Sequence, residues 1–568
     1  MLLSTVRDDS NPRLPVLGRV VRHGGLVGRA TVDPYVEEFL ALRGIDIPDE
    51  FVRVVPDAES ELMAVNKYSQ KPFPIDASTQ YAMDVATDWV IHDLRPHCET
   101  KFVNLEKVTE YIDLSKNPGG LWMNSYSTKY EALYSPEFME WYREEYWPSQ
   151  FTTVPIWTIT SWFMKTEMRS RKKALENAVR SISGKSLEHI LAMNQFDLHF
   201  NLDFVRWGGA GWSALGVPLV RGGWKSLVLD KLGRFPNNYE LDVVLNDSTM
   251  HLPSHLAVQT VRMGCRRELW PDELQLANAN LWLQKFCGLQ VLSDGTVMWK
   301  WHGQDSGQCS TISDNTVRSK IIFMASFIWM WVNKFGHTPL YADYKQHVAD
   351  LHLGDDCNFS TDDDVADWFN ARTVILWYRN HLGVIAKTPC EEPRAVDEVE
   401  FLSQKTSYAR GFPLPALDGV KMLCSLRWGS EHVGSVTTTL QRACGFRLAT
   451  YASPDEFAIV DEFAHWLLGK FDPIMSGDPE WEASKHAFFT QSEIARLWIP
   501  PQFFKSQALS PCAFKTKMPK KLNSQAGQKK AMLKVSTPRP KVTAAPKKKA
   551  TLKVKQVTSI PRTIRSAP

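Results

Sequence analysis

The sequence contains no long hydrophobic run and no closely spaced cysteine pair. Its longest apolar run, residues 321–332, has twelve residues, whereas a membrane-spanning helix needs about 20. We therefore expect a buried helix there. The nine cysteines form no C-x-x-C pair, so no structural zinc site is evident and we expect reduced thiols in a cytosolic protein. The N-terminus also lacks the apolar core of a signal peptide.

The last 58 residues contain no acidic side chain. Residues 511–568 hold 16 of the chain's 66 Lys and Arg residues, which leaves 50 basic against 63 acidic residues before position 511. The body is therefore acidic and the C-terminal segment strongly basic. Because residues 513–568 are also poor in large apolar side chains, we expect them to be disordered and to bind an anionic partner, either nucleic acid or a membrane surface.

The rest of the composition is that of a globular protein. The chain has 568 residues, of which 44% are hydrophobic and 23% charged. This length allows a large core and roughly two to four domains.

A glycine followed by two aspartates lies between two short apolar runs. Gly354, Asp355 and Asp356 follow residues 351–353 and precede residues 357–359. This pattern predicts a β-hairpin with the acids at its tip, because glycine adopts turn conformations that other residues resist. Adjacent carboxylates repel each other unless a cation balances them, and Mg²⁺ prefers such oxygen ligands. A solvated turn is the alternative on these residues alone.

An acidic residue also interrupts an apolar strand pattern upstream. Residues 239–245 predict a strand that contains Asp242, and Asp247 follows before Pro253. A carboxylate inside a buried strand needs a partner or a metal. The spacing predicts Asp242 at the C-terminal end of the strand and Asp247 in the turn beyond it.

A hairpin, a polar loop and a helix lie between these two acidic segments. Residues 289–300 predict a hairpin with its turn at residues 293–295, and the loop at residues 306–315 leads into the helix expected through residues 321–332. On a helix, Thr311 and Asn315 are four residues apart and share a face. Their hydroxyl and amide groups suit either recognition of a sugar hydroxyl or hydrogen bonds to the local backbone.

The densest basic stretch of the body covers residues 165–173, and Arg180 follows it. It predicts either a solvated charged surface or the wall of a channel for triphosphate and template. Upstream, residues 115–120 form a turn cluster whose backbone amides suit either a phosphate or an ordinary loop.

Three further features follow the Gly-Asp-Asp motif. The acids at positions 362–364 precede a periodic apolar stretch, and we interpret them as the N-cap and first turn of a helix rather than as metal ligands. Lys387 is expected in a loop, and residues 399–403 predict another short strand. Residues 405–510 show mixed helical patterning.

The order of these motifs is typical of one family. An acid pair spaced D-x4-D is followed by S-G-x3-T-x3-N and then by G-D-D, all within 115 residues. In this order the motifs resemble those of the RNA-dependent RNA polymerases of positive-strand RNA viruses, and the central loop looks most like the astrovirus-like and related small-virus polymerases. Looser similarities link Lys165, Glu167 and Arg180 to the basic fingers motif, residues 115–120 to the loop through which the template enters, Lys387 to the palm lysine, and residues 401–403 to the primer-grip hairpin.

The resemblance implies an α+β right-hand fold with fingers, palm and thumb, in which the palm is a small antiparallel sheet flanked by helices. It implies two Mg²⁺ ions, with Mn²⁺ as a substitute, one activating the primer 3′-hydroxyl and one steadying the leaving pyrophosphate. Asp242 and Asp355 are the expected bridging ligands, with Asp356 peripheral. Lys387 is the expected general acid that protonates the pyrophosphate.

The same resemblance implies the substrate-binding residues. Lys165 and Arg180 are expected to neutralise the triphosphate. A polar set is expected to bond the ribose 2′-hydroxyl and to reject a sugar that lacks it, because the polar groups would stay unpaired. That set comprises Asp247, Thr311 and Asn315, with Ser306 and Gly307 beside them.

The resemblance also implies a domain order and a set of partners. We expect an N-terminal extension with fingertips at residues 1–110, fingers at 111–238, a palm with an inserted part of the fingers at 239–404, a thumb at 405–512 and the disordered tail at 513–568. The expected partners are RNA template and product, NTPs, other viral replication proteins, and a membrane surface contacted by the tail. The expected location is the host cell cytoplasm, in membrane-associated replication complexes.

Two other classes share part of this pattern. A reverse transcriptase shares the palm, but an aromatic side chain is expected near Asp247, where this chain has Ser248 and Thr249. A non-catalytic RNA-binding protein has no need to keep Asp242, Asp355 and Asp356 together.

Overall fold

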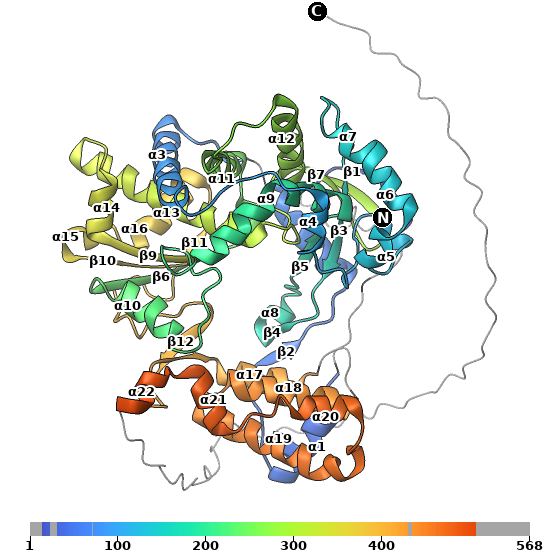
Figure 1. The fold of residues 1–568 in the computed structure, drawn as a ribbon. Helices are drawn as coiled ribbons and strands as arrows, with labels where there is room; N and C mark the ends of the chain where they lie inside the picture. Colours follow the sequence, from blue (N-terminus) through green and yellow to red (C-terminus); the bar gives the residue numbers. More distant parts are fainter. Residues whose placement is uncertain (1–13, 23–25, 27–30, 71, 430–433, 507–568) are drawn as a thin grey trace, which may run out of the picture. The chain divides into compact units, whose positions relative to one another are not determined.

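Figure 1 shows the fold as a computed structural model, which describes residues 14–22, 26, 31–70, 72–429 and 434–506. The basic tail predicted at residues 513–568 lies outside the described residues. The described elements belong to one unit, residues 1–508. The eight cysteines in the described part of the chain are all free thiols. No described helix is long and apolar enough to cross a membrane.

A four-stranded antiparallel sheet with the strand order β11-β6-β10-β9 carries the acidic motifs (Figure 1). Its strands are β6 (Asn237–Val243), β9 (Val348–Leu353), β10 (Asp356–Thr361) and β11 (Ala386–Lys387). Side chains alternate between the two faces of a sheet, and both faces of this sheet are covered by apolar clusters. Leu241 and Phe359 belong to the main core, whereas Leu351 belongs to a smaller cluster around Trp224. The predicted strand at 239–245 and the predicted Gly-Asp-Asp hairpin are therefore both present.

Long helices build the main core on one face of this sheet. They are α3 (Ala77–Leu94), α9 (Leu187–Trp207), α11 (Leu252–Gly264), α12 (Asp272–Phe286), α13 (Thr311–Phe335) and α16 (Ala371–Leu382). Helix α13 packs along α3 and contacts β9. Every residue from 321 to 328 of α13 is buried, which confirms the expected buried helix. On the other face, α10 (Asp230–Leu232) contacts β9 and β10.

A second, five-stranded sheet has the order β1-β8-β7-β3-β5. Its strands are β1 (Val16–Arg19), β3 (Ile159–Met164), β5 (Ser181–Gly184), β7 (Gly288–Val291) and β8 (Thr296–Lys300). Strands β7 and β8 form the hairpin predicted at residues 289–300. They pair with β1 and β3, which precede β6 in the sequence. The sheet therefore joins segments from both sides of β6.

The C-terminal helices share a core with a helix from the N-terminal region. That core contains α1 (Pro34–Arg43), α17 (Gly419–Arg427), α18 (Val436–Ala449), α19 (Pro454–Met475) and α20 (Pro479–Lys485). Arg442 and the buried Asp33, which caps α1, form an ion pair of 2.8 Å. Strand β2 (Phe51–Arg53) then pairs with β4 (Met168–Ser170). The N-terminal segment thus connects the C-terminal helices to the region of the five-stranded sheet, and the predicted domain boundaries stay a prediction.

The remaining described α-helices are short. They are α2 (Ala58–Asn66), α4 (Leu105–Thr109), α5 (Lys129–Leu133), α6 (Pro136–Trp141), α7 (Trp147–Ser149), α8 (Arg171–Leu175), α14 (Tyr341–His347), α15 (Asp363–Ala366), α21 (Gln491–Trp498) and α22 (Pro501–Ser506).

Two local predictions are wrong. Residues 399–403 form no strand, because Leu402 and Ser403 adopt positive φ angles of 55° and 58° and turn the chain instead. The strands of this region follow as β12 (Gln404–Ser407) and β13 (Leu414–Leu417). Lys387 does not lie in a loop, because it pairs with Asp242 as the edge strand β11.

Candidate active site

Asp242 and Asp356 lie directly opposite each other on the neighbouring strands β6 and β10. Cross-strand partners have Cβ atoms about 4.5–5.5 Å apart, so the register brings together two carboxylates that are distant in the sequence. Asp355 occupies the turn beside Asp356, and the charge of Asp242 contributes to its raised pKa. The three acids predicted as metal ligands therefore converge where β6 ends and β10 begins, at one end of the two inner strands.

Helix α13 holds the turn that carries these acids. Gly354 has a φ of +64°, which places this residue in the left-handed region that favours glycine. Its backbone N–H donates to Thr316 Oγ1 at 2.9 Å. A Cβ added to Gly354 would lie 3.2 Å from Ile312 Cδ1, so the turn packs closely on the start of α13.

Buried polar contacts also fasten the hairpin to α13 below its tip. His352 Nδ1 and Ser319 Oγ are 2.9 Å apart. Lys320 Nζ lies 2.6 Å from Asp350 Oδ2, and both side chains are almost fully buried. Breaking a buried pair of this kind costs about 3–5 kcal/mol, because the remaining charge is left without a partner. The helix that begins with the predicted ribose-binding residues thus also positions the predicted metal ligands.

The acids at the hairpin tip carry raised pKa values. Partial burial, followed by the charges of Asp355 and Asp242, raises the pKa of Asp356 to about 7. Burial and the charges of Asp242 and Asp247 raise the pKa of Asp355, whereas Arg180 lowers it. Several carboxylates that disfavour one another's ionisation are the arrangement that a bound cation relieves.

Lys387 lies on the other side of Asp242. The two residues are paired in register on β11 and β6, and Lys387 Nζ lies 2.9 Å from Asp242 Oδ2. Asp242 therefore has a carboxylate on one neighbouring strand and an ammonium group on the other. Because both side chains are about half exposed (59% and 49%), solvent screens the pair and little energy is needed to separate it.

The donor set of Asp242, Asp355 and Asp356 fits divalent cations of the hard, oxygen-preferring kind. Among the described residues, however, only His347, Asp362 and Asp364 bring three ligand atoms of His, Cys, Asp or Glu within 4.8 Å of one another. The three palm carboxylates therefore need side-chain rotation, with release of Asp242 from Lys387, to bind a common ion.

The predicted triphosphate cations lie at the adjoining ends of β3 and β5. Lys165 follows β3 and Arg180 precedes β5, and the Lys165 N–H donates to the Arg180 carbonyl at 2.8 Å. Partial burial and the charge of Arg180 lower the pKa of Lys165, whereas the charges of Glu167 and Asp247 raise it. Arg180 also lowers the pKa of Asp355 and therefore lies close enough to the acidic cluster to influence it, whereas Lys165 interacts with Asp247.

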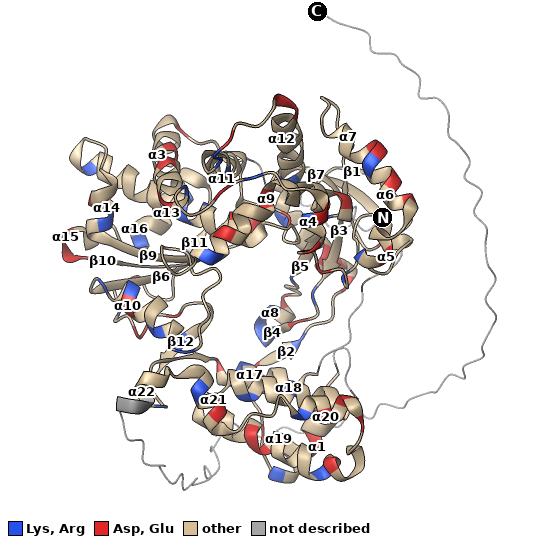
Figure 2. Cartoon of the chain, in the orientation of Figure 1, with Lys and Arg blue, Asp and Glu red and all other residues tan. Residues whose placement is uncertain are grey.

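The basic stretch contributes a further cation that was not singled out from the sequence. Burial and the neighbouring Arg169 and Lys387 lower the pKa of Lys173, and Asp242 raises it. Lys173 lies on α8, where Figure 2 shows basic residues clustered. The only indication of Lys173 in the sequence was its place within the dense basic stretch at residues 165–173.

Two members of the predicted ribose-binding set meet directly. Asn315 Nδ2 donates to Asp247 Oδ1 at 2.9 Å. Burial raises the pKa of Asp247, and the hydrogen bond from Asn315 lowers it. The Asn315 Oδ1 atom is buried and has no hydrogen-bond partner among the described residues. The pair thus presents an unused acceptor of the kind that a sugar hydroxyl satisfies.

The other members of that set fasten the loop instead. Thr311 Oγ1 donates to the Asp305 carbonyl at 3.0 Å. The Ser306 N–H donates to Ser183 Oγ at 2.8 Å, and the Ser183 N–H donates to Ser306 Oγ at 3.1 Å. The Gly307 N–H donates to the Ser183 carbonyl at 3.0 Å. These three residues therefore join the start of α13 to β5, and their contacts are with protein groups.

Two buried charge networks under this loop were not anticipated. Asp305 lies 2.8 Å from both Lys185 and Lys300. Burial alone would raise the pKa of Asp305, but the two ammonium groups hold it below its ordinary value. Asp314 lies 2.6 Å from Arg262 and 2.7 Å from Lys285. Lys300 is only five residues from Asp305, but Lys185, Lys285 and Arg262 lie far from their partners in the chain, where no local sequence pattern connects them.

The turn cluster at residues 115–120 packs on the five-stranded sheet. Gly119 and Gly120 have φ angles of +69° and +58°. A Cβ on Gly119 would lie 2.6 Å from the Lys185 carbonyl oxygen, which leaves no room for a side chain. Ser161 Oγ on β3 donates to the Gly120 carbonyl at 3.1 Å.

The sequence and the fold of this chain are similar to those of known proteins. Residues 57–460 match the family model of the viral RNA-dependent RNA polymerase. The chain belongs to the viral RNA-dependent RNA polymerase family. The family's right-hand fold agrees with a Sicinivirus 3Dpol RNA-dependent RNA polymerase structure, which matches with a TM-score of 0.61 at 13% identity and covers 86% of this chain and 98% of that one.

The curated relatives of this chain named here are genome polyproteins. That of Brome streak virus (strain 11-Cal) is 21% identical over 341 residues, which is 60% of this chain and 10% of the polyprotein. That of Tobacco vein mottling virus is 23% identical over 317 residues, 54% of this chain and 10% of the polyprotein. The chain thus spans about a tenth of these relatives. None of the relatives named here is an astrovirus protein, so the finer resemblance to astrovirus-like polymerases stays a prediction.

Proposed function

We propose that this chain is an RNA-directed RNA polymerase that replicates a viral RNA genome. It would transfer a nucleoside monophosphate from an NTP to an RNA 3′-hydroxyl, in the order set by an RNA template. The observation that carries this proposal is the convergence of Asp242, Asp355 and Asp356 from two paired strands. The family of the chain supports the same activity.

Each group at the site has a role in this reaction. When bound, two Mg²⁺ ions held by Asp242 and Asp355, with Asp356 beside them, supply activation of the 3′-hydroxyl and stabilisation of the leaving pyrophosphate. Arg180 and Lys165 balance the charge of the triphosphate. Lys387, released from Asp242, donates a proton to the leaving pyrophosphate.

The choice of ribose over deoxyribose rests on the pair of Asp247 and Asn315. The unused Oδ1 acceptor of Asn315 accepts a hydrogen bond from the 2′-hydroxyl, and a deoxyribose leaves it unpaired. No aromatic residue stands beside Asp247 in the sequence, since Asn246 precedes it and Ser248 follows it. This arrangement favours an RNA polymerase over a reverse transcriptase.

Purified full-length protein with a defined RNA template, labelled NTPs and Mg²⁺ tests the proposal. We expect a product whose length and sequence follow the template and whose synthesis stops when the complementary NTP is left out. Extension with dNTPs in preference to NTPs would favour the reverse transcriptase alternative. RNA binding without any extension in Mg²⁺ or Mn²⁺ would favour the non-catalytic alternative.

We further propose that the basic segment 513–568 binds RNA without sequence preference and raises the local concentration of template. Its 16 basic and no acidic residues across positions 511–568 support this proposal. The same charge suits an anionic membrane surface or another viral replication protein, within membrane-associated replication complexes of the host cytoplasm. These are the alternative partners that the test of the tail distinguishes.

A further inference from the structure

The far end of the Gly-Asp-Asp hairpin carries a second group of potential ligands. Strands β9 and β10 are paired from the turn to Val348 and Thr361. His347 ends α14 just before β9, and Asp362 follows β10. The Asp362 N–H donates to the His347 carbonyl at 3.2 Å. The backbone therefore fixes these two residues across the open end of the hairpin.

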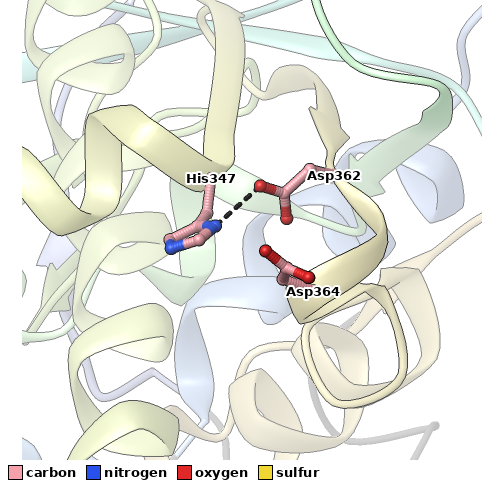
Figure 3. A group of neighbouring side chains, drawn as sticks. All are labelled: His347, Asp362 and Asp364. Atoms are coloured by element: carbon pink, nitrogen blue, oxygen red, sulfur yellow. Dashed lines mark hydrogen bonds and ion pairs between the residues drawn. The ribbon is translucent and has the colours of Figure 1, made fainter.

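The side chains of His347, Asp362 and Asp364 are directed toward one another (Figure 3). His347 Nδ1 lies 2.7 Å from Asp362 Oδ2. One ligand atom from each of the three residues lies within 4.8 Å of the other two. Two ligands bound to one cation at about 2.0–2.2 Å lie roughly 3 Å apart, so the first pair already has a suitable separation. Asp364 is exposed and has room to rotate inward.

The side chain of Asp362 does not cap a helix. Asp362 is the N-cap residue of α15, as the sequence indicated, but its side chain makes no capping hydrogen bond. One carboxylate oxygen contacts His347 instead. The other, Oδ1, is shielded from solvent and has no hydrogen-bond partner among the described residues. A shielded carboxylate oxygen without a partner is costly, and a cation would satisfy it.

We propose that His347, Asp362 and Asp364 bind Zn²⁺. An imidazole ligand suits Zn²⁺ and similar transition-metal ions, whereas Mg²⁺ prefers ligand sets made of oxygen alone. Three protein ligands with an open position for water form a known type of zinc coordination. The site is separate from Asp355 and Asp356, because six residues of strand at about 3.3 Å each place it roughly 20 Å from the hairpin tip.

The ion would join α14, β10 and α15 at the base of the hairpin that carries Asp355 and Asp356. The ion would thereby hold the base of the strands that position the active-site acids, with water completing its coordination. The simpler alternative is an ion pair between His347 and Asp362, with Asp364 in solvent.

Titration of full-length protein with Zn²⁺ in an excess of Mg²⁺ tests this site. Bound Zn²⁺ is measured by competition with a chromogenic chelator, and the Zn²⁺-induced change in Tm is measured on the same samples. The test variant is Asp364→Asn, because an exposed residue is the least costly to change. The control is Asp363→Asn, which makes the same charge change one residue away. Asp363 accepts a hydrogen bond from Asn237 and lies outside the ligand group.

We expect wild type and Asp363→Asn to bind one more equivalent of Zn²⁺ than Asp364→Asn, and only these two to gain Tm on Zn²⁺ addition. His347→Ala should lose the same equivalent, which confirms the imidazole as a ligand. Zinc bound at the palm acids is common to all four proteins and cancels in the comparison. Equal stoichiometry and equal Tm changes in all of them would overturn the proposal in favour of the simple ion pair.

Discussion

Lys387 Nζ lies 2.9 Å from Asp242 Oδ2, across the pair of strands that carries them. The residue assigned as proton donor is thus held by a residue assigned as metal ligand. A cation that binds Asp242 competes with Lys387 for the same carboxylate. In the proposed reaction Lys387 therefore has to leave Asp242 before it donates a proton to the leaving pyrophosphate.

Replacing Lys387 by Arg separates these two roles. The guanidinium keeps the ion pair with Asp242 but does not lose a proton at neutral pH. We expect the single-nucleotide incorporation rate to fall about 10²–10⁴-fold, the usual contribution of a general acid, with little change in NTP affinity. Lys345→Arg is a matched control, because Lys345 pairs with Asp93 on the surface, away from the palm acids. A rate near that of wild type would restrict Lys387 to positioning Asp242.

Replacing Asn315 by Ala tests whether this residue discriminates ribose from deoxyribose. The variant loses the unused acceptor and the hydrogen bond to Asp247. We expect the preference for NTP over dNTP to fall about 10–100-fold, the worth of one or two hydrogen bonds to the substrate. Asn333→Ala on the same helix is the control, because its exposed side chain donates to the Trp329 carbonyl one turn earlier in α13. Unchanged discrimination would leave Asn315 with a purely structural role.

A buried carboxyl away from the site gives the protein a pH-dependent stability. Burial raises the pKa of Glu188, at the start of α9, to about 7, although hydrogen bonds from Ser186 and others lower it. A folded-state pKa above the unfolded value gives a contribution that is present at low pH and is lost as pH rises from about 4 to about 7.

Glu188→Gln should remove this dependence. Relative to wild type, the free energy of unfolding of the variant should be higher at pH 8 than at pH 4 by about 1–3 kcal/mol, because one pKa unit corresponds to about 1.4 kcal/mol. Urea unfolding of both proteins at the two pH values measures the difference. The same difference at both pH values would mean that Glu188 keeps an ordinary pKa in the folded protein.

Deleting residues 513–568 tests the basic tail. Each phosphate contact releases counterions, so the logarithm of RNA affinity falls with the logarithm of salt concentration by roughly 0.7 per contact on single strands. We expect the truncated protein to bind RNA more weakly and with a flatter salt dependence, while nucleotide addition on a preformed complex is spared. Superimposable curves would assign the tail to a membrane surface or to another viral protein.

The sequence predicted the parts of the site whose signals are local. The strand through Asp242 and the Gly-Asp-Asp hairpin each have their own alternation and turn residues, so their existence followed from short patterns. The expected convergence of Asp242 with Asp355 came from the order of motifs in the family rather than from any local rule, and the residue directly opposite Asp242 is Asp356. The same resemblance placed Asn315 and Asp247 in one polar set, but their direct hydrogen bond is seen only in the structure.

Features that depend on tertiary contacts were missed or wrong. The apolar side chains at residues 399–403 resemble a strand, but Phe401 is buried in the cluster around Trp224 while Leu402 and Ser403 turn the chain. The residues around Lys387 show no strand pattern in the sequence, and β11 exists only because it pairs with β6. The ion pair of Asp305 with Lys185 joins segments 120 residues apart in the sequence, 305 − 185, which no sequence period connects.

The exchange of Asp355 for Asn tests the central claim most directly. This change keeps the shape of the turn and removes one charge from the proposed metal centre, and Asp294→Asn in the turn between β7 and β8 is its control. Template-directed incorporation of labelled NTPs in Mg²⁺ is measured for both variants, with RNA binding and Tm on the same samples. We predict that Asp355→Asn lowers incorporation by about 10²-fold or more while RNA binding and Tm stay close to those of wild type. Incorporation by Asp355→Asn at the level of wild type and Asp294→Asn would contradict the account.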